Sequence, residues 1–321
     1  MVTVILPTNG RADYLREAIR SAQNQSFAAF VVLIGDNANS AECAAIVAAA
    51  ADSRLRYIAH PHNLGAQGNW LELIRLAQTP LVATLHDDDA WRSDFLARLV
   101  PPMLANEQLA MSFGDFNLID RCGQPLTQAA SALSHQTHRD CLPEGLTPTS
   151  LEAGLRLTAV WNAPNPAICA VIRRQVVLDT TFPEAAAPLY DLWLDYQLVK
   201  RGASMHYVRA KLTDYRIHPQ SASTAGFAAP EDFIFNTIVS ENAAAGPVVV
   251  EIKQYWASIR WGRAVRKMPQ NACRIESQLE FRAAAPDLSS RIKRMAAWLA
   301  ARSNIAWSLL RMARQLKPRP W

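Results

Sequence analysis

The chain has 321 residues, of which 50% are hydrophobic and 19% charged, as in an ordinary soluble globular protein. No apolar run reaches the roughly 18 residues that a transmembrane helix requires, and the opening MVTVILPTNGR lacks the basic and apolar segments of a secretory signal. The net charge of +5 is uneven, since residues 251–321 carry 15 Lys and Arg against 4 Asp and Glu, which leaves 18 against 24 in residues 1–250.

The cysteines and the basic residues indicate the cellular compartment and the kind of partner that the chain has. The five cysteines are scattered without metal-ligand spacing, which fits a reducing, cytoplasmic compartment. The charge asymmetry predicts an acidic body followed by a basic tail. Because the basic residues lack clustered aromatic platforms, we do not expect nucleic acid as a partner.

Strand and helix patterns alternate through the first 120 residues. The apolar runs VTVILPT, FVVLIGD, RLRYIAH and LVATLHD predict strands, and each precedes a segment with helical spacing. Those helices are expected in RADYLREAIRSAQNQ, SAECAAIVAAAAD, AQGNWLELIRLAQ and SDFLARLVPPML, with Ser40 capping the second and Ser93 the fourth. Near-continuous apolar strands that alternate with helices predict an α/β fold with a mostly parallel sheet covered on both faces.

After about residue 110 the pattern changes. LAMSFGDFNLIDRCGQPL predicts a strand, a turn and a returning strand, and PAICAVIRRQVV predicts a strand that enters a helix. Residues 123–150 are rich in Ser, Thr, His and Pro and predict a mobile loop. YDLWLDYQLVKRG predicts a helix ended by Gly202, TDYRIHPQSAS predicts a strand that runs into a loop, and residues 225–321 are predicted to be mostly helical.

Three polar segments, Pro7–Arg11, Asp36–Asn39 and Asp87–Asp89, follow predicted strands. In parallel sheets, ligands bind at the carboxyl ends of the strands, near a switch in strand order. The first two segments also fit simple turns into helices. As binding segments, the first would present helix N–H groups and Arg11 to a nucleotide, and the second would direct the carboxylate of Asp36 at a nucleobase N–H.

The run LHDDDAW is harder to explain as a solvated surface, because it follows a buried strand. Three adjacent carboxylates repel one another, and Ser93 and Asp94 suffice to cap the next helix. Mg²⁺ and Mn²⁺ take carboxylate oxygens together with substrate phosphates, so a divalent cation would offset the repulsion among Asp87, Asp88 and Asp89. A solvated acidic run is the alternative.

Two later segments supply further polar candidates. Asp191 and Asp195 lie one turn apart on a predicted helix and share a face. Asp191 either complements the helix dipole in the first turn or, as the better placed of the two acids, serves as a general base. Arg216 and His218 flank a single residue, so that both could face one polar cleft, where Arg216 would suit a diphosphate.

In this order and spacing, the segments resemble the family 2 glycosyltransferases, which have the nucleotide-sugar-binding GT-A fold. TVILPTNGRADYLREAIRSAQNQSF is similar to the family's opening strand and helix, VVLIGDNANS to its Asp-Asp-Gly-Ser-type nucleotide motif, and LHDDDAW to its DxD-type metal motif. HNLGAQGNW, with Asn63, Gly65 and Asn69, resembles a third characteristic segment, and YRIHPQSAS resembles the late Tyr-Arg-x-His segment.

The resemblance implies a GT-A domain over residues 1–224, with a nucleotide-binding part over about 1–120 and an acceptor part over about 121–224, followed by a helical, basic region over 225–321. It implies an inverting, metal-dependent, hexosyltransferase-like enzyme. Such an enzyme moves a sugar from a nucleotide-sugar donor, here taken as a UDP-sugar, to a saccharide or lipid-linked saccharide. The expected setting is bacterial surface polysaccharide or glycan assembly.

Roles for single residues follow from the same resemblance. The positions that match the nucleoside-binding residues of the family are Pro7, Thr8, Arg11 and Asp36. Asp87 and Asp88 would face the sugar and the metal-bound diphosphate, and Asp88 or Asp89 would bind Mg²⁺ or Mn²⁺. Counting back from Gly202, Asp191 takes the position of the catalytic base, and Tyr190 replaces a Glu that precedes it in the family. The other departures from the family pattern are Asn9-Gly10, Gly35 and His86.

Two other functions stay open at this point. A nucleotidyltransferase would also use a parallel sheet and acidic metal ligands, although PTNGR matches its Gly-rich, basic first loop poorly. A nucleotide-sugar-binding protein with a decayed site would explain Gly35 and the missing Glu. Calorimetry with a nucleoside diphosphate, with and without Mn²⁺, distinguishes the last from an active enzyme.

The basic tail also has two interpretations. Residues 288–321 place apolar and basic side chains at helical spacing, as in a helix that packs on the core with a solvated basic face. The same pattern suits a helix on an anionic membrane surface, where it would bring the enzyme to a lipid-linked acceptor. The second interpretation predicts a peripheral location on the inner face of the cell membrane.

Overall fold

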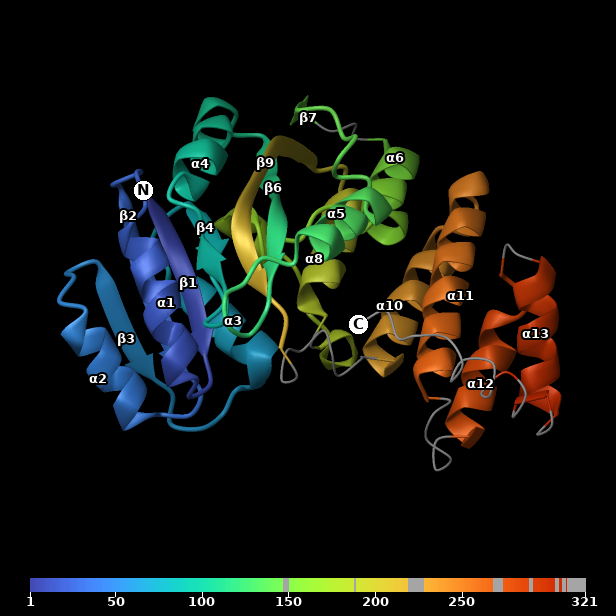
Figure 1. Cartoon of the computed structure of the whole chain (residues 1–321). Coiled ribbons are helices and arrows are strands. Elements are labelled where there is room, and N and C mark those ends of the chain that lie inside the picture. Colours follow the sequence, from blue (N-terminus) through green and yellow to red (C-terminus); the bar gives the residue numbers. More distant parts are fainter. Residues whose placement is uncertain are drawn as a thin grey trace. The chain divides into compact units, whose positions relative to one another are not determined.

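The computed structural model describes residues 1–146, 150–187, 189–218, 228–267, 274–288, 291–303, 306, 307 and 310. The chain forms two compact units, residues 1–234 and 235–321 (Figure 1). The domain boundary predicted after residue 224 falls among residues 219–227, outside the described part. None of the helices in the described part is both long and apolar enough to cross a bilayer.

The first unit is built on a nine-stranded sheet with the strand order β3-β2-β1-β4-β8-β6-β9-β5, and β7 pairs with β9. Four strands at one side run parallel and follow the predicted apolar runs: β1 (Val2–Thr8), β2 (Phe30–Asp36), β3 (Leu55–Ala59) and β4 (Leu81–Thr84). The fold is therefore α/β, with the parallel half where the alternating pattern predicts it.

The other half of the sheet is mixed. Its strands are β5 (Ala90–Trp91), β6 (Leu109–Ile119), β7 (Gly145–Leu146), β8 (Ala170–Arg173) and β9 (Ser204–Arg216). β8 lies antiparallel between β4 and β6, and β9 runs parallel to β6. β5 and β7 pair antiparallel with β9. This arrangement places the β9 segment next to the one that follows β4.

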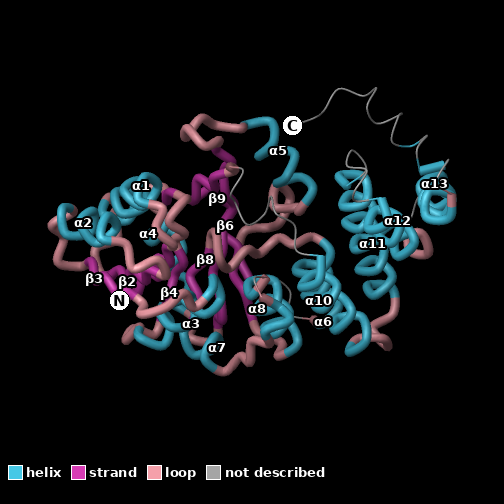
Figure 2. Tube along the Cα trace, turned by 90° about the horizontal axis from the view of Figure 1, so that it is seen from below, coloured by secondary structure: helices cyan, strands magenta, loops and turns pink. Residues whose placement is uncertain are grey.

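Helices cover both faces of the parallel half (Figure 2). On one face lie α1 (Ala12–Gln23), α2 (Ala41–Ala49) and α4 (Phe95–Ala105). On the other face lie α3 (Gly65–Leu76) and α7 (Arg174–Leu178). The later part of the unit adds α5 (Thr127–Gln136), α6 (Leu151–Leu155), the π-helical turn Arg156–Val160, the 3-10 turn Glu184–Ala186 and α8 (Tyr190–Lys200).

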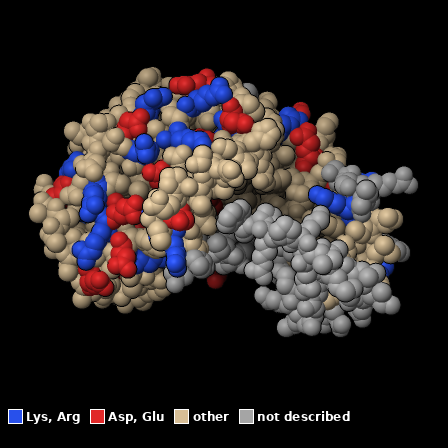
Figure 3. Space-filling view, in the orientation of Figure 1, with Lys and Arg blue, Asp and Glu red and all other residues tan. Residues whose placement is uncertain are grey.

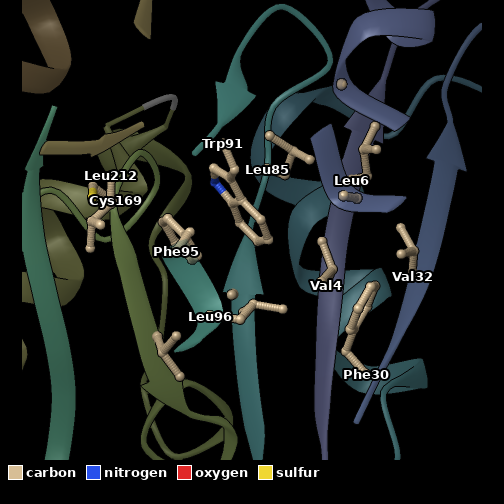
Figure 4. Packing of buried hydrophobic residues seen from close by; sticks show 14 of the residues in the cluster. Val4, Leu6, Phe30, Val32, Leu85, Trp91, Phe95, Leu96, Cys169 and Leu212 are labelled. Atoms are coloured by element: carbon tan, nitrogen blue, oxygen red, sulfur yellow. The ribbon is translucent and has the colours of Figure 1, made fainter. Parts of the chain in front are cut away.

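The core explains why the first strands read as continuous apolar runs. Val4 and Leu6 of β1 point to the face covered by α1 and α4, and Phe30 and Val32 of β2 lie beside them (Figure 4). The intervening Ile5 is also fully buried, because α3 covers the opposite face. Burial of each large apolar side chain stabilises the fold by about 1.5–3 kcal/mol. A strand buried on both faces therefore favours apolar residues at every position.

The two predicted helix caps have different outcomes. Ser40 caps α2, and its hydroxyl accepts a hydrogen bond from the Cys43 N–H at 3.2 Å. Ser93 does not cap α4, because that helix begins after Asp94. The side chain of Asp94 accepts no capping hydrogen bond either. The carbonyl of Ser93 instead accepts the Ser26 N–H at 2.8 Å and ties the start of α4 to the end of α1.

The prediction of a mobile loop over residues 123–150 is wrong for most of that segment, which contains α5 and β7. A buried ion pair holds it, with Arg139 Nε 2.8 Å from Asp115 Oδ1 and both side chains almost fully buried. Ser134 of α5 donates to Asp115 Oδ2 at 2.7 Å, and the Tyr207 hydroxyl donates to the Arg139 carbonyl at 2.7 Å. Removing either charge would leave the other buried alone, so the pair fixes the segment.

The second unit is helical in its described residues, as predicted. α10 (Ala228–Glu241) crosses the boundary between the units, and α11 (Pro247–Lys267), α12 (Arg274–Ala284) and α13 (Arg291–Arg302) follow. Its core gathers around Phe281 and Trp307, whose indole Nε1 donates to Ser277 Oγ at 3.1 Å.

On the face seen in Figure 3, Lys and Arg side chains of the first unit lie between Asp and Glu side chains.

Candidate active site

The carboxyl ends of β1, β2 and β4 meet at one edge of the sheet, as their parallel register requires. Thr8 pairs with Asp36 across β1 and β2, and the Asn37 N–H donates to the Thr8 carbonyl at 3.0 Å. Pro7 lies within β1, opposite Gly35. The Thr8 hydroxyl reaches the segment after β4 and donates to Asp87 Oδ2 at 2.6 Å. The structure thus brings the first and third predicted binding segments into direct contact.

Arg11 sits over the acidic run. One guanidinium nitrogen lies 3.0 Å from Asp87 Oδ1 and 2.8 Å from Asp88 Oδ2, and the Arg11 side chain is 36% exposed. Burial raises the pKa of Asp87, while the charge of Arg11 and the Thr8 hydrogen bond oppose that rise. Arg11 therefore offsets part of the repulsion that the sequence predicts and still has an open side toward solvent.

Arg216, at the end of β9, also donates hydrogen bonds to the acidic run. The Arg216 N–H donates to Asp89 Oδ1 at 2.9 Å, and its Nε donates to the Asp88 carbonyl at 2.8 Å. The rest of the buried guanidinium contacts the Asp120 carbonyl and the carboxylate of Glu17. Arg216 is thus engaged by protein groups, and the contact with a diphosphate predicted for it stays a prediction.

His218, the last described residue before residue 228, lies beside Asp88. Its Nε2 is 3.0 Å from Asp88 Oδ2, the oxygen that also contacts Arg11. The ring of His218 packs against Tyr14 of α1, with 5.2 Å between centroids. The prediction that Arg216 and His218 approach a common polar site agrees with this geometry, because both contact Asp88.

One atom of the acidic run has a distinct environment. Asp89 is 2% exposed, and its Oδ2 has no hydrogen-bond partner among the described residues. His86 Nδ1 lies 3.8 Å away, and His86, Asp88 and Asp89 each offer one ligand atom within 4.8 Å of the others. Burial and the charge of Asp88 raise the pKa of Asp89 well above its usual range. A divalent cation would satisfy the orphaned oxygen, so these residues fit a metal site.

Asp36 is fully buried, and its carboxylate already has protein donors. Oδ1 accepts the Ala38 N–H at 2.9 Å, and Oδ2 accepts the Ser40 N–H and the Tyr57 hydroxyl, each at 2.8 Å. These bonds shape the turn between β2 and α2. The nucleobase contact expected of Asp36 stays a prediction.

The segment that contains Asn63, Gly65 and Asn69 lies beside the same strand ends. Asn37 ties it down, since its amide donates to the Gly65 carbonyl at 3.1 Å, and Asn63 Oδ1 accepts the Gly65 N–H at 2.8 Å. Asn69 is 1% exposed and donates to the carbonyls of Gly35 at 2.8 Å and Thr8 at 3.3 Å. Asn69 therefore braces β1 against β2 from within the core.

α8 carries the two remaining acids. Asp191 is half-buried in the first turn, and its Oδ1 accepts the Leu192 N–H at 2.9 Å. Burial raises its pKa, which strengthens it as a base. Asp195 is 1% exposed, and neither of its carboxyl oxygens has a hydrogen-bond partner among the described residues. Burial and the charge of Asp191 raise the pKa of Asp195 well above its usual range.

A contact that the sequence does not predict joins α8 to the acidic run. The Tyr190 hydroxyl lies 3.3 Å from His86 Nε2, and the Tyr190 ring stacks on Trp70 with 4.7 Å between centroids. The two hydrogen-bonded residues are 104 positions apart, so local spacing carries no signal for the pair. The departures of both positions from the family pattern are the one clue in the sequence.

Comparisons with known proteins concern the family and the fold of the chain. Residues 3–143 match the family model described as "Glycosyl transferase family 2". Over 144 residues the chain is 27% identical to the putative teichuronic acid biosynthesis glycosyltransferase TuaG of Bacillus subtilis, covering 44% of this chain and 57% of that protein. Over 117 residues it is 32% identical to the GalNAc(5)-diNAcBac-PP-undecaprenol beta-1,3-glucosyltransferase of Campylobacter jejuni, covering 36% of this chain and 37% of that protein. The chain thus spans about half the length of the curated relatives it matches.

Solved structures show the fold over the whole chain. The crystal structure of S. aureus TarS 1–349 superposes with a TM-score of 0.67 at 14% identity, over 100% of this chain and 93% of that one. Its complex with UDP-GlcNAc gives a TM-score of 0.65 at 15% identity, over 98% and 91%. The fold is therefore the GT-A fold shared with these structures, and residues 3–143 resemble glycosyl transferase family 2.

Proposed function

We propose that the chain is an inverting glycosyltransferase that moves a sugar from a nucleotide-sugar to an acceptor hydroxyl. The observation that carries the proposal is the contact between His86 and Tyr190. It joins a buried acidic run suited to a metal–diphosphate to the helix turn that bears a carboxylate with a raised pKa. The match of residues 3–143 to glycosyl transferase family 2 and the fold shared with TarS support the same reaction class.

The donor is proposed to be a UDP-sugar, because TarS has been solved with UDP-GlcNAc and with UDP. Thr8 and the turn at Asp36 would face the nucleoside, and Arg11 would meet the diphosphate with its exposed side. When the donor binds, its negative charge would compete with Asp87 and Asp88 for the guanidinium of Arg11. The oxygens released in this way would be free to interact with a cation.

Asp89 and Asp88 are proposed to hold Mn²⁺ or Mg²⁺, with His86 and His218 beside them. The ion would neutralise charge on the departing diphosphate. Asp89 is the stronger candidate ligand, because its Oδ2 is buried without a partner while Asp88 Oδ2 already contacts Arg11 and His218. This assignment explains why three adjacent carboxylates are retained at a buried strand end.

Asp191 is proposed as the general base. Its carboxylate takes the proton of the acceptor hydroxyl as that oxygen attacks the anomeric carbon from the side opposite the nucleoside diphosphate. The bond from the acceptor oxygen to the anomeric carbon forms while the bond to the phosphate oxygen breaks, so the nucleoside diphosphate leaves and the configuration inverts. Because burial raises the pKa of Asp191, the carboxylate is a better proton acceptor than a solvated Asp.

The acceptor is proposed to be a lipid-linked saccharide in surface polysaccharide assembly. Two relatives are named for transfer to undecaprenol-linked diphosphate sugars and one for teichuronic acid biosynthesis. A cytoplasmic protein would reach such acceptors from the membrane surface, and α13 exposes Met295 by 61% and Leu299 by 40%, one turn apart. Sedimentation with anionic vesicles, comparing the wild type with Met295→Asp/Leu299→Asp, tests this location, and equal binding by both proteins would contradict it.

A donor screen that measures release of nucleoside diphosphate tests the reaction class. We expect release from a UDP-sugar that depends on Mn²⁺ or Mg²⁺ and increases with a saccharide acceptor. Release of pyrophosphate from a nucleoside triphosphate and sugar phosphate would instead identify a nucleotidyltransferase. Calorimetry that finds no metal-dependent binding of UDP, GDP or dTDP would identify a decayed site.

A further inference from the structure

Tyr190 is held by Trp70 of α3 on its ring and by His86 of the acidic segment at its hydroxyl. Its side chain is 5% exposed, its ring stacks on Trp70 at an interplanar angle of 28°, and its hydroxyl meets His86 Nε2. The indole Nε1 of Trp70 in turn donates to Thr84 Oγ1 at 2.9 Å. Thr84 ends β4, and His86 follows it by two residues. Both contacts therefore anchor the first turn of α8 to the carboxyl end of β4.

His86 connects this anchor to the candidate metal ligands. While Nε2 faces the Tyr190 hydroxyl, Nδ1 lies 3.8 Å from the orphaned Oδ2 of Asp89. The imidazole thus lies between the acidic run and α8 and faces each with a different nitrogen. A neutral imidazole has one donor and one acceptor nitrogen, so a hydrogen bond to Tyr190 at Nε2 also fixes the character of Nδ1.

A hydrogen bond between His86 and Tyr190 can hold the two side chains at a fixed distance. Two carboxylates separated by 3.3 Å would repel each other, whereas a phenol and an imidazole form a neutral hydrogen bond. Burial raises the pKa of the Tyr190 hydroxyl, which keeps it protonated and able to take part in that bond. Asp191 follows Tyr190 directly in the chain, so any shift of the Tyr190 backbone moves the carboxylate that is proposed to take the proton.

We propose that His86 and Tyr190 form a positioning pair that sets the distance between the acidic run and Asp191. The pair acts through Asp191, so this proposal rests on the proposed function of that residue. Neither member transfers a proton to or from the acceptor. A transfer reaction is sensitive to the placement of the base, and a misplacement of about 1 Å costs roughly 100-fold in rate.

The first test replaces Tyr190 by Phe, which removes the hydroxyl and keeps the ring on Trp70. We expect kcat for transfer to fall about tenfold, while KM for the donor and the calorimetric affinity for UDP–Mn²⁺ change less than about twofold. The matched control is Tyr207→Phe, which removes another buried hydroxyl, bonded to the Arg139 carbonyl at 2.7 Å. The control should lower thermal stability comparably and leave kcat unchanged.

A double-mutant cycle then tests the pairing. In the His86→Ala background, Tyr190→Phe should change kcat by less than about twofold, because its partner is already missing. Losses that multiply, or a Tyr190→Phe variant with wild-type kcat, would overturn the proposal. Loss of UDP–Mn²⁺ binding in Tyr190→Phe would also overturn it, since the hydroxyl would then act on the donor site.

Asp191→Asn, measured in parallel, separates this proposal from the proposed function. If Asp191→Asn keeps wild-type turnover, the assignment of the base fails, and the positioning proposal fails with it. If Asp191→Asn abolishes transfer while Tyr190→Phe is silent, the base assignment stands and the positioning pair alone is wrong.

Discussion

The two acidic regions of the first unit differ in how their charges are balanced. In the run Asp87–Asp89, protein donors reach both carboxylate oxygens of Asp87 and one oxygen each of Asp88 and Asp89, and they come from β1, from the loop before α1 and from the end of β9. On α8, Asp191 accepts one backbone N–H and Asp195 has no hydrogen-bond partner among the described residues. Burial raises the pKa of Asp87 and Asp89 in the first region and of both acids in the second, so the two regions differ in the number of donors that hold the carboxylates.

This difference affects how readily each carboxylate binds a proton. A buried carboxylate that accepts several hydrogen bonds or faces a cation stays ionised, while one without partners binds a proton more readily. Asp88 contacts Arg11 and His218, but Asp195 contacts no donor among the described residues. A cluster of carboxylates held by donors suits a cation and a diphosphate, because a cation would offset the burial that raises the pKa of Asp87 and Asp89. A carboxylate with a raised pKa and few partners suits proton transfer.

The strongest challenge to this comparison is Asp191→Asn. Because an amide cannot accept the acceptor proton, transfer should fall by roughly 100- to 10,000-fold. Calorimetry should find UDP–Mn²⁺ affinity unchanged, since the variant leaves the acidic run intact. The matched control is Asp195→Asn, the same chemical change one turn away, which should keep transfer within about threefold. If the two variants exchange phenotypes, the base is Asp195.

The second challenge is Asp89→Asn. The variant keeps an oxygen for the Arg216 N–H but replaces the orphaned carboxylate oxygen by an amide. We expect the affinity for Mn²⁺ in the presence of UDP to fall roughly 10- to 100-fold, which is typical when one residue that supports a metal site is replaced. Electron paramagnetic resonance of free Mn²⁺ measures it directly. Asp52→Asn, at an ion pair with Arg54, is the control, and equal Mn²⁺ binding by all three proteins would contradict the site.

A third prediction concerns stability and pH. Burial raises the pKa of Asp195 in the folded chain, so the folded state retains a proton that the unfolded state releases above about pH 4. The stability contributed by this proton is fully present below that pH and is lost as the pH rises toward the folded-state pKa. Relative to Asp195→Asn, the free energy of unfolding of the wild type should fall between two pH values above about pH 4, by up to about 1.4 kcal/mol per pH unit while the folded state retains the proton.

Chemical denaturation at the two pH values measures this slope. Asp191→Asn is the comparison variant. Because Asp191 is less buried than Asp195 and keeps a backbone hydrogen bond, the difference in slope between the wild type and Asp191→Asn should be smaller. Equal slopes for the wild type and Asp195→Asn would mean that Asp195 is ionised in the folded state. The contrast between the paired and unpaired acids would then be wrong.

Local features of the sequence predicted a good part of the fold. The four parallel strands, the Ser40 cap and the helix that carries Asp191 follow from apolar periodicity and capping chemistry within short windows. The meeting of the segments at Thr8 and Asp87 also followed, because the ends of parallel strands must share an edge. These inferences required no knowledge of contacts between distant residues.

What escaped prediction depends on distant partners. The Arg139–Asp115 ion pair orders a segment whose composition is typical of a loop, and nothing near Arg139 in the sequence indicates its partner. Arg216 contacts Asp89 across 127 positions, so its buried role could not be separated from a role at a ligand. The same holds for His86 and Tyr190, since each departs from the family pattern but neither indicates the other as its partner.

The last prediction concerns Gly35, which stands where the family often has an Asp. An added Cβ would lie 2.3 Å from Asn69 Oδ1, 2.9 Å from Leu73 Cδ2 and 3.0 Å from His60 Nε2. Gly35 is thus required by the close approach of Asn69, which braces β1 against β2. Gly35→Ala should lower the free energy of unfolding by about 1–3 kcal/mol through overpacking.

The Asn69→Ala background decides between overpacking and other causes. If the clash with Asn69 produces the loss, then Gly35→Ala should cost measurably less in that background, because the opposing oxygen is gone. Chemical denaturation of the four proteins gives the coupling. Equal costs in both backgrounds would locate the strain at Leu73 or His60 instead. Asn69 would then brace the strands without dictating the residue at position 35, and the departure of Gly35 from the family pattern would need a cause in the turn that follows β2.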